Sequence, residues 1–346
     1  MNEEKEAMAM MRVMAIPSPR GRFRLEERPL PEPGREEVRI RVAACGVCHS
    51  DSLTVEGLMP GIRYPRVPGH EVIGTIEALG PDVDGWSVGT RVGVGWFGGS
   101  CGYCPQCRRD SAFACENVQE VTGVTRDGGY ATHMLARVPA LARVPDDLDS
   151  VTSAPLLCAG MTTFNALRNA GAGPGDLVAI LGVGGLGHLG IQYGARQGFH
   201  TVAVNRGRDK EELARSLGAY EYLDSAVADP AAALRAMGGA KAILATATSA
   251  EAMEAIMGGL GPNGTLMVIG AVPKLTINSL DLLAKRAAVK GWYSGTGRDS
   301  EDTLMFSRMN GIASINEIYP FERAQDAYEH MMSGNARFRV VLRMDD

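Results

Sequence analysis

The sequence lacks the long apolar runs and the basic excess that mark membrane and nucleic-acid-binding proteins. No stretch of about 18 apolar residues occurs among its 346 residues, so we expect no transmembrane helix. The formal net charge of −5 argues against a nucleic-acid-binding surface. The N-terminal segment is acidic and has no apolar core of the kind that signal peptides carry, so no secretion signal is expected. The sequence also shows no internal repeat and no low-complexity segment.

The composition is otherwise that of a globular protein. Hydrophobic residues make up 45% and charged residues 22% of the chain, which allows large buried cores. A length of 346 residues indicates about two domains. The 43 glycines fit a chain with many turns and a loop that approaches a ligand closely.

Cysteine is the first residue type that points to chemistry. The chain has seven cysteines, an odd number: Cys45, Cys48, Cys101, Cys104, Cys107, Cys115 and Cys158. The first five of them follow a Cys-x-x-Cys spacing. Such spacing favours metal ligation in a reducing compartment over a framework of disulfides. We therefore expect a cytoplasmic protein.

One segment contains a potential set of zinc ligands, Cys48 and His70. A catalytic zinc takes three protein ligands and keeps one open position, so a third ligand should lie elsewhere, and Cys158 is the best candidate. Ser50 places a hydroxyl two residues from the Cys48 thiol. The carboxylates that neighbour the two ligands in sequence, Asp51 and Glu71, are placed to hold them by hydrogen bonds.

A second group of cysteines follows the pattern Cys-x-x-Cys-x-x-Cys-x₇-Cys and comprises Cys101, Cys104, Cys107 and Cys115. Four thiols at this spacing can close a tetrahedral shell around zinc. Two disulfides are disfavoured in a reducing compartment. An iron–sulfur cluster is the other alternative, although no proline follows the last cysteine and the seven-residue gap is long for that class.

The first part of the chain is predicted to be rich in β-strands. Residues 38–42 alternate between apolar and charged side chains, residues 71–78 form another candidate strand, and β character returns over 128–145. A helix is predicted over 154–170, with Cys158 near its start. Alone, a cysteine beside leucines is more often part of a core than a ligand.

A change of pattern begins at residue 175. A continuous apolar run at 178–181 predicts a strand buried on both faces, and a glycine-rich turn, Gly182-Val183-Gly184-Gly185-Leu186-Gly187, follows directly. A helix over 189–198 and a strand over 201–204 come next. This strand–turn–helix–strand context is what a dinucleotide fingerprint requires, because glycines let the backbone approach a pyrophosphate at a helix N-terminus.

Further alternation of strand and helix follows, with strands at 242–245 and 265–269 and a helix at 250–260. The alternation predicts an α/β fold with a doubly wound parallel sheet. The C-terminal part is predicted to contain a helix at 323–333 and a last strand at 339–342.

Taken in order, these features resemble the zinc-dependent alcohol dehydrogenases of the medium-chain dehydrogenase/reductase superfamily over essentially the whole chain. The resemblance implies a GroES-like β-barrel catalytic domain with a structural-zinc lobe over 1–158 and 297–346. It implies a Rossmann dinucleotide-binding domain over 159–296.

The same resemblance implies roles for individual residues. Cys48, His70 and Cys158 match the catalytic zinc ligands, and the four-cysteine cluster matches the structural zinc. Ser50 matches the hydroxyl that bonds the substrate alcohol, Asp51 the carboxylate behind the histidine ligand, and Glu71 a carboxylate near the metal. His49 and Arg339 match residues that face the cofactor pyrophosphate. Trp96 matches an aromatic residue that lines the substrate pocket; the alternative is that it belongs to the hydrophobic core.

Two departures from the family pattern stand out. Residues 52–54 are Ser, Leu and Thr, where many members place a histidine that passes the proton to solvent. The proton route must then end at water or at His49. The second Rossmann strand usually ends in an acidic residue, but here it ends in Asn205, followed by Arg206. An arginine accommodates the 2′-phosphate of NADP, so we expect NAD(P) as cofactor, with NADP used at least as well as NAD.

The predicted activity is reversible hydride transfer between an alcohol and NAD(P), giving an aldehyde or ketone. Zinc would polarise the alcohol oxygen, Ser50 would take the proton, and the nicotinamide would take the hydride. Two alternatives remain: a zinc-free quinone reductase of the same superfamily, and a non-catalytic zinc-binding interaction or redox-sensing protein. We expect a small-molecule substrate, two zinc ions per chain and a homo-oligomer.

Overall fold

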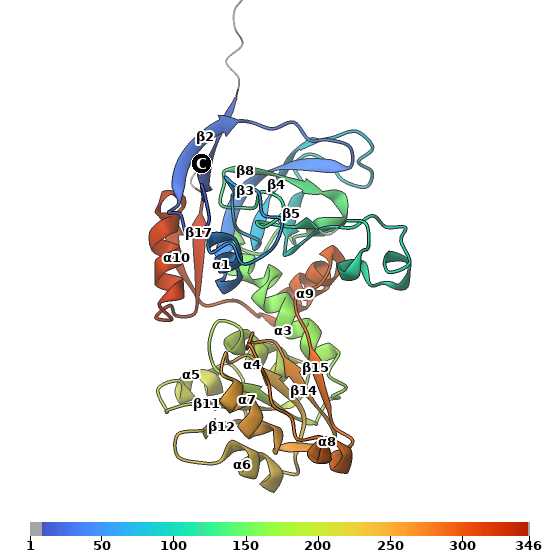
Figure 1. Cartoon of the computed structure of the whole chain (residues 1–346), viewed down its shortest axis with the longest axis vertical. Coiled ribbons are helices and arrows are strands. Elements are labelled where there is room, and N and C mark those ends of the chain that lie inside the picture. The colour runs from blue at the N-terminus through green and yellow to red at the C-terminus, as the bar shows by residue number, and fades with distance from the viewer. Residues whose placement is uncertain (1–8, 119, 345–346) are drawn as a thin grey trace, which may run out of the picture. The chain divides into compact units, whose positions relative to one another are not determined.

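The computed structural model describes residues 9–118 and 120–344. The chain divides into two compact units (Figure 1). The first comprises residues up to Cys158 together with Gly295–Arg308 and the segment from Ile315 to the C-terminus; the second comprises Ala159–Ser294 and Met309–Ser314. The short segment 309–314 therefore belongs to the second unit, whereas the sequence analysis assigned it to the catalytic domain.

The first unit is built around a largely antiparallel sheet. Its strands run in the order β16-β17-β3-β4-β5-β9, and β8 also pairs with β3. Two separate pairs, β1 with β2 and β6 with β7, complete the unit. The strands are β1 (Met10–Ala15), β2 (Arg24–Pro29), β3 (Glu37–Val47), β4 (Val72–Leu79), β5 (Arg91–Val94), β6 (Phe97–Gly99), β7 (Glu120–Val121), β8 (His133–Arg137), β9 (Leu141–Arg143), β16 (Asn316–Pro320) and β17 (Arg339–Arg343).

Alternation along β3 produces the expected burial. Val38 and Ile40 are fully buried, and the arginines between and after them point away from the core. Strand β17 pairs antiparallel with β3, which brings a segment near the end of the described chain into this sheet. The helical segments of the unit are short, apart from α9 and α10: η1 (His49–Asp51), α1 (Ser52–Val55), η2 (Cys107–Arg109), η3 (Ala112–Ala114), η4 (Val138–Ala140), α2 (Ser150–Ser153), η5 (Ala154–Leu157), α9 (Gly297–Asn310), η6 (Phe321–Arg323) and α10 (Ala324–Met332).

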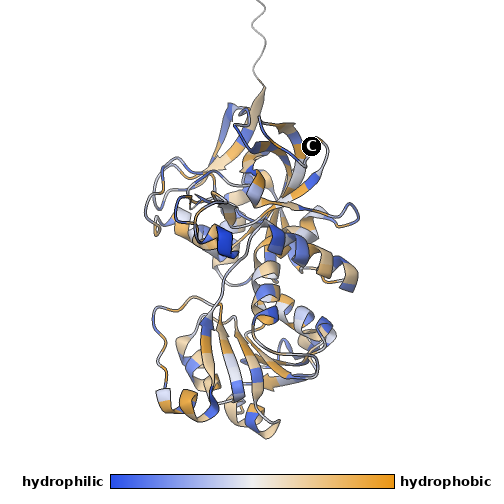
Figure 2. Ribbon diagram, turned by 90° about the vertical axis from the view of Figure 1, so that its right-hand side faces the viewer, coloured by the Kyte–Doolittle hydropathy of each residue, from blue (hydrophilic) through white to orange (hydrophobic). Residues whose placement is uncertain are grey.

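The second unit contains a six-stranded parallel sheet in the order β12-β11-β10-β13-β14-β15. The order reverses at β10, which is the arrangement of a doubly wound dinucleotide-binding sheet. All five residues of β10 are buried, as predicted for a strand covered on both faces. Figure 2 shows apolar segments along these strands. The elements are β10 (Leu177–Leu181), β11 (His200–Asn205), β12 (Glu221–Asp224), β13 (Ala240–Ala245), β14 (Leu260–Val268), β15 (Ala288–Gly291), α3 (Ala159–Arg168), α4 (Gly187–Arg196), α5 (Glu211–Ser216), α6 (Pro230–Ala236), α7 (Ala250–Met257) and α8 (Ser279–Lys285).

Two helix predictions need correction, and the 14-residue helix α9 was not predicted. The helix expected over 154–170 is broken at Cys158, whose φ of −130° and ψ of −73° separate η5 from α3. Helix α7 ends at Met257 because two glycines follow it. Helix α9 was missed, although Thr296 and Asp299 bond to each other across its first turn like a capping box.

None of the helices in the described part of the chain combines the length and the apolar character that a transmembrane span requires.

Candidate functional site

Three segments of the first unit bring Cys48, His70 and Cys158 together. Cys48 follows β3, His70 precedes β4, and Cys158 lies at the break after η5. One potential ligand atom from each, together with a carboxylate oxygen of Glu71, lies within 4.8 Å of all the others. The Cys48 and Cys158 sulfurs are 3.9 Å apart. The break that the sequence did not predict turns Cys158 out of the helix and into this cluster.

The donor set fits a metal ion. Both ring nitrogens of His70 are buried without a well-oriented hydrogen bond among the described residues, and a buried unsatisfied group calls for a partner. The contact with Cys158, opposed by burial, holds the pKa of Cys48 well below its usual range. The same contact and burial raise the pKa of Cys158. One thiol of the pair therefore ionises readily, and the thiolate is the form that binds metal.

The carboxylate of Asp51 lies behind both Cys48 and His70. Its Oδ1 is 3.1 Å from His70 Nδ1, and its Oδ2 accepts the backbone N–H of Cys48 at 2.9 Å. The same Oδ2 accepts the hydroxyl of Tyr130 at 2.9 Å. Burial, followed by the charge of Asp51, raises the pKa of Tyr130 well above its usual range, so the phenol stays protonated and donates.

Glu71 and Arg339 form a fully buried ion pair beside the cluster. Arg339 Nη2 bonds to Glu71 Oε1 and donates to the carbonyl oxygen of Val47 at 3.3 Å. Burial raises the pKa of Glu71 to about 7, against the lowering effect of Arg339. Arg339 therefore lies beside the candidate metal ligands. The expected contact of Arg339 with a cofactor pyrophosphate stays a prediction.

Three other predicted residues surround the cluster. Ser50 and His49 lie in η1, where Ser50 is half-buried and His49 is exposed. Trp96 is half-buried, and its ring packs edge-on against the imidazole of His70 with centroids 4.9 Å apart. Trp96 is therefore a neighbour of the histidine and not remote core. The proton route beyond Ser50 stays a prediction.

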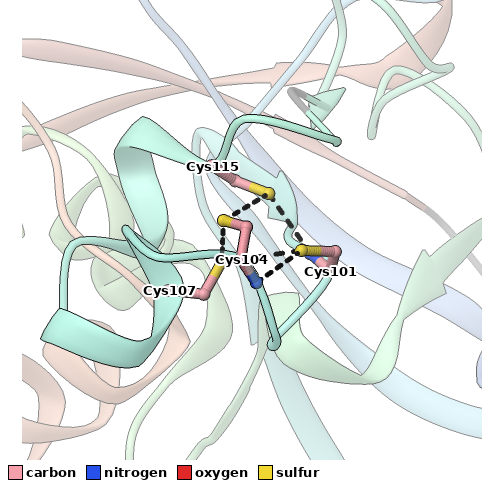
Figure 3. Close-up of side chains that lie close together, drawn as sticks. All are labelled: Cys101, Cys104, Cys107 and Cys115. Atoms are coloured by element: carbon pink, nitrogen blue, oxygen red, sulfur yellow. Dashed lines mark hydrogen bonds between the residues drawn. The ribbon is translucent and has the colours of Figure 1, made fainter.

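The second cysteine cluster is compact. The thiols of Cys101, Cys104, Cys107 and Cys115 point toward one another (Figure 3), with sulfur–sulfur distances of 3.4 to 4.0 Å for three of the pairs. Four sulfurs about 2.3 Å from a tetrahedral zinc would lie about 3.8 Å apart. All seven cysteines of the chain are free thiols. Backbone N–H groups of three residues donate to the sulfurs of Cys101 and Cys115, which stabilises thiolates.

In the second unit, the glycine-rich turn connects β10 to α4. A Cβ at Gly187 would lie 1.8 Å from the carbonyl oxygen of Gly182, so only glycine allows the helix to pack this closely on the strand. A Cβ at Gly184 would meet nothing within 4 Å, which leaves its backbone open to a ligand. Gly185 and Leu186 complete the turn before α4 begins at Gly187. The turn fits a dinucleotide pyrophosphate at the N-terminus of this helix.

The end of β11 faces this turn. Asn205 Oδ1 accepts the backbone N–H of Val183 at 3.2 Å. Arg206 is exposed, and its guanidinium makes no ion pair within the described residues. The neighbouring Arg208 is held by Glu211 at 2.8 Å, so it is less free to bind a phosphate.

Two residues of these sites were missed by the sequence analysis. Tyr130 follows Gly128 and Gly129, which were read only as part of a β-rich region. Lys210 donates to the carbonyl oxygen of Val183 at 2.9 Å and so lies against the glycine-rich turn. Neither contact could be found by spacing, because each joins segments that only the fold brings together.

Comparison with known proteins agrees with both halves of the chain. Residues 34–146 match the model "Alcohol dehydrogenase GroES-like domain", and residues 185–309 match "Zinc-binding dehydrogenase". The alcohol dehydrogenase notN of Aspergillus sp. (strain MF297-2) is 44% identical over 322 residues, which cover 93% of this chain and 94% of the relative.

Two solved structures are also similar. The cobalt- and zinc-bound thermostable alcohol dehydrogenase from Pyrobaculum aerophilum superposes with a TM-score of 0.86 at 26% identity, covering 97% of this chain and all of the other. The acetophenone reductase from Geotrichum candidum, solved in complex with NAD, has a TM-score of 0.83 at 26% identity, covering 96% of this chain and 97% of the other. By its sequence and its fold, the chain belongs to the zinc-type alcohol dehydrogenases of the medium-chain dehydrogenase/reductase superfamily.

Proposed function

We propose that this protein is an NAD(P)-dependent, zinc-containing alcohol dehydrogenase that interconverts an alcohol with an aldehyde or ketone. The observation that carries the proposal is the convergence of Cys48, His70 and Cys158, in which Nδ1 of the fully buried imidazole faces Asp51 and Nε2 has no hydrogen-bond partner among the described residues. A zinc-free quinone reductase has no need of this set. A non-catalytic zinc protein needs neither this set nor a dinucleotide turn.

The two clusters support different roles for two zinc ions. Cys48, His70 and Cys158 offer three ligands, which leaves a position for substrate, while the four cysteines of the second cluster offer a closed shell. When bound at the first set, zinc supplies Lewis acidity toward the alcohol oxygen. Arg339 forms an ion pair with Glu71 beside these three ligands, so the Glu71 carboxylate is bound by the guanidinium.

Ser50 is the proposed proton acceptor. It lies two residues from Cys48 on the turn that also carries Asp51, and it is half-buried. Its hydroxyl would accept the alcohol proton and pass it to water or to the exposed His49. Asp51 holds His70 and the backbone of Cys48 in place during this transfer. When bound, the nicotinamide of the cofactor would supply the hydride acceptor.

The cofactor would bind along the turn from Gly182 to Gly187, with its adenosine ribose near Asn205. Asn205 carries no charge that would repel a 2′-phosphate, and Arg206 offers an exposed guanidinium next to it. These two features support NADP as a cofactor used at least as well as NAD. The NAD complex of the related acetophenone reductase supports a nicotinamide cofactor in general.

Metal analysis combined with an activity screen tests the proposal. The wild type should contain two zinc ions per chain and oxidise members of a panel of primary and secondary alcohols with NAD or NADP. Cys48→Ser should abolish this activity and leave one zinc ion per chain. A wild type with one zinc or none, or a Cys48→Ser variant with full activity, would reject the assignment.

A further inference from the structure

The proposal begins with the way Asp51 is held. This buried carboxylate contacts two proposed ligands at once, the ring of His70 and the backbone of Cys48. A single oxygen, Oδ2, accepts from both Cys48 and Tyr130. Two side chains therefore contact the Asp51 carboxylate within the described part of the chain. One is the imidazole of His70, and the other is the phenol of Tyr130, which donates a hydrogen bond.

Tyr130 also contacts the other ligand segment. A Cβ on Gly69, the residue before His70, would lie 2.4 Å from Cδ1 of the Tyr130 ring, and Gly69 has a φ of +100°. The backbone N–H of Tyr130 donates to the carbonyl oxygen of Pro68 at 3.0 Å, and that of Gly129 donates to Gly69 at the same distance. The ring and backbone of Tyr130 therefore fix the turn that delivers His70, while its hydroxyl fixes Asp51.

We infer that Tyr130 is a positioning residue for the metal centre, acting through Asp51 on both Cys48 and His70. The inference rests on the proposed function, since it assumes that these residues bind the metal. Groups that orient metal ligands by hydrogen bonds raise metal affinity, and their loss typically weakens it roughly 10- to 100-fold. Tyr130 contacts Asp51 and not a ligand side chain, so we expect its loss to weaken metal affinity roughly 10-fold, at the lower end of this range.

The chain offers a matched control in Tyr328. Phe23 contacts both rings, with centroids 5.6 Å from Tyr130 and 5.7 Å from Tyr328. The hydroxyl of Tyr328 is buried as well, but it has no hydrogen-bond partner within the described residues. Tyr130→Phe and Tyr328→Phe thus remove the same atom from the same aromatic cluster, and only the first removes a bond to Asp51.

The experiment measures zinc release to a chelator from purified full-length protein, together with the thermal midpoint. Tyr130→Phe should release the zinc of the Cys48 set roughly 10-fold faster than the wild type, while the zinc of the four-cysteine cluster is retained. Tyr328→Phe should behave like the wild type. After replacement of the released zinc by Co²⁺, the d–d absorption bands of Tyr130→Phe should differ from those of the other two proteins.

Four results would overturn the inference. Unchanged release and an unchanged cobalt spectrum in Tyr130→Phe would show that the hydroxyl does not position the ligands. Equal effects of the two substitutions, or loss of both zinc ions together from Tyr130→Phe, would show a general packing role. A wild type with no metal at the Cys48 set would reject the proposed function and this inference with it, whereas the first three results leave the proposed function intact.

Discussion

At the residue scale, the site depends on a few side chains whose surroundings differ more than their sequence neighbours suggest. Ser50 and Asp51 are adjacent, yet Ser50 is half-buried and its hydroxyl makes no hydrogen bond within the described residues, while Asp51 is buried and contacts Cys48, His70 and Tyr130. A hydroxyl that is not committed to the protein can exchange a proton with substrate. A carboxylate with three partners is suited to holding its neighbours in place.

Ser50→Ala should lower kcat by roughly 10²-fold or more, the usual scale of positioned acid–base catalysis. The affinity for cofactor should stay unchanged, because Ser50 lies on the turn that carries the metal ligands and not on the glycine-rich turn. Ser50→Thr keeps a hydroxyl and should restore most of the rate. Steady-state kinetics and cofactor titration measure both quantities; a Ser50→Ala variant with wild-type turnover would mean that water takes the proton directly.

The preference between NADP and NAD is predicted to depend on Arg206 and Asn205. Arg206→Ala should lower kcat/KM for NADP roughly 10-fold and leave that for NAD nearly unchanged, because a charged hydrogen bond to phosphate is lost. Asn205→Asp should shift preference toward NAD by repelling the 2′-phosphate. Arg208→Ala is the matched control, since that guanidinium is already paired with Glu211. A wild type that strongly prefers NAD and does not respond to Arg206→Ala would contradict the prediction.

At the element scale, the segment between β6 and β7 illustrates structure that depends on a metal. Over its described residues, 100–118, it contains only the short turns η2 and η3, and the exposed aromatics Tyr103 and Phe113 add little to a core. The four thiols contact one another, and backbone N–H groups of the segment donate to two of their sulfurs. Metal binding at such a closed site contributes folding free energy directly.

Cys104→Ser should therefore impair folding before it affects chemistry. We expect a thermal midpoint lower by roughly 5–10 °C and loss of one zinc ion, with early proteolysis within the segment 100–118. Cys45→Ala provides the control, because Cys45 is a buried free thiol outside both clusters. Scanning calorimetry, metal analysis and limited proteolysis provide the readouts; a Cys104→Ser protein with two zinc ions and an unchanged midpoint would refute the structural role.

At the scale of the whole molecule, one surface of the second unit favours self-association. Strand β15 lies at an edge of the described sheet, and none of the residues of the neighbouring α8 is buried. Leu280 and Leu283 on α8 are 70% and 74% exposed. Open strand edges and exposed leucines of this kind usually pair with another chain. This supports the expected homo-oligomer, which stays a prediction.

The combined substitution Leu280→Glu and Leu283→Glu should shift the protein from an oligomer to a smaller species in light scattering coupled to size exclusion. Val227→Glu is the control, because Val227 is an exposed apolar residue of the same unit that lies between β12 and α6. A wild type that is monomeric at micromolar concentration, or a double variant of unchanged mass, would count against this surface.

The sequence by itself determined the β-rich first part, the α/β alternation of the second part, the four-cysteine pattern and the dinucleotide turn, because each depends on residues close together in the chain. Periodicity in β3 and the glycines before α4 are examples. Tertiary structure alone decided which distant groups meet: the break that turns Cys158 toward Cys48, the pairing of Arg339 with Glu71, and the bond from Tyr130 to Asp51. These contacts form because a buried charge or polar group must find a partner wherever the fold provides one, and local sequence carries no record of that choice.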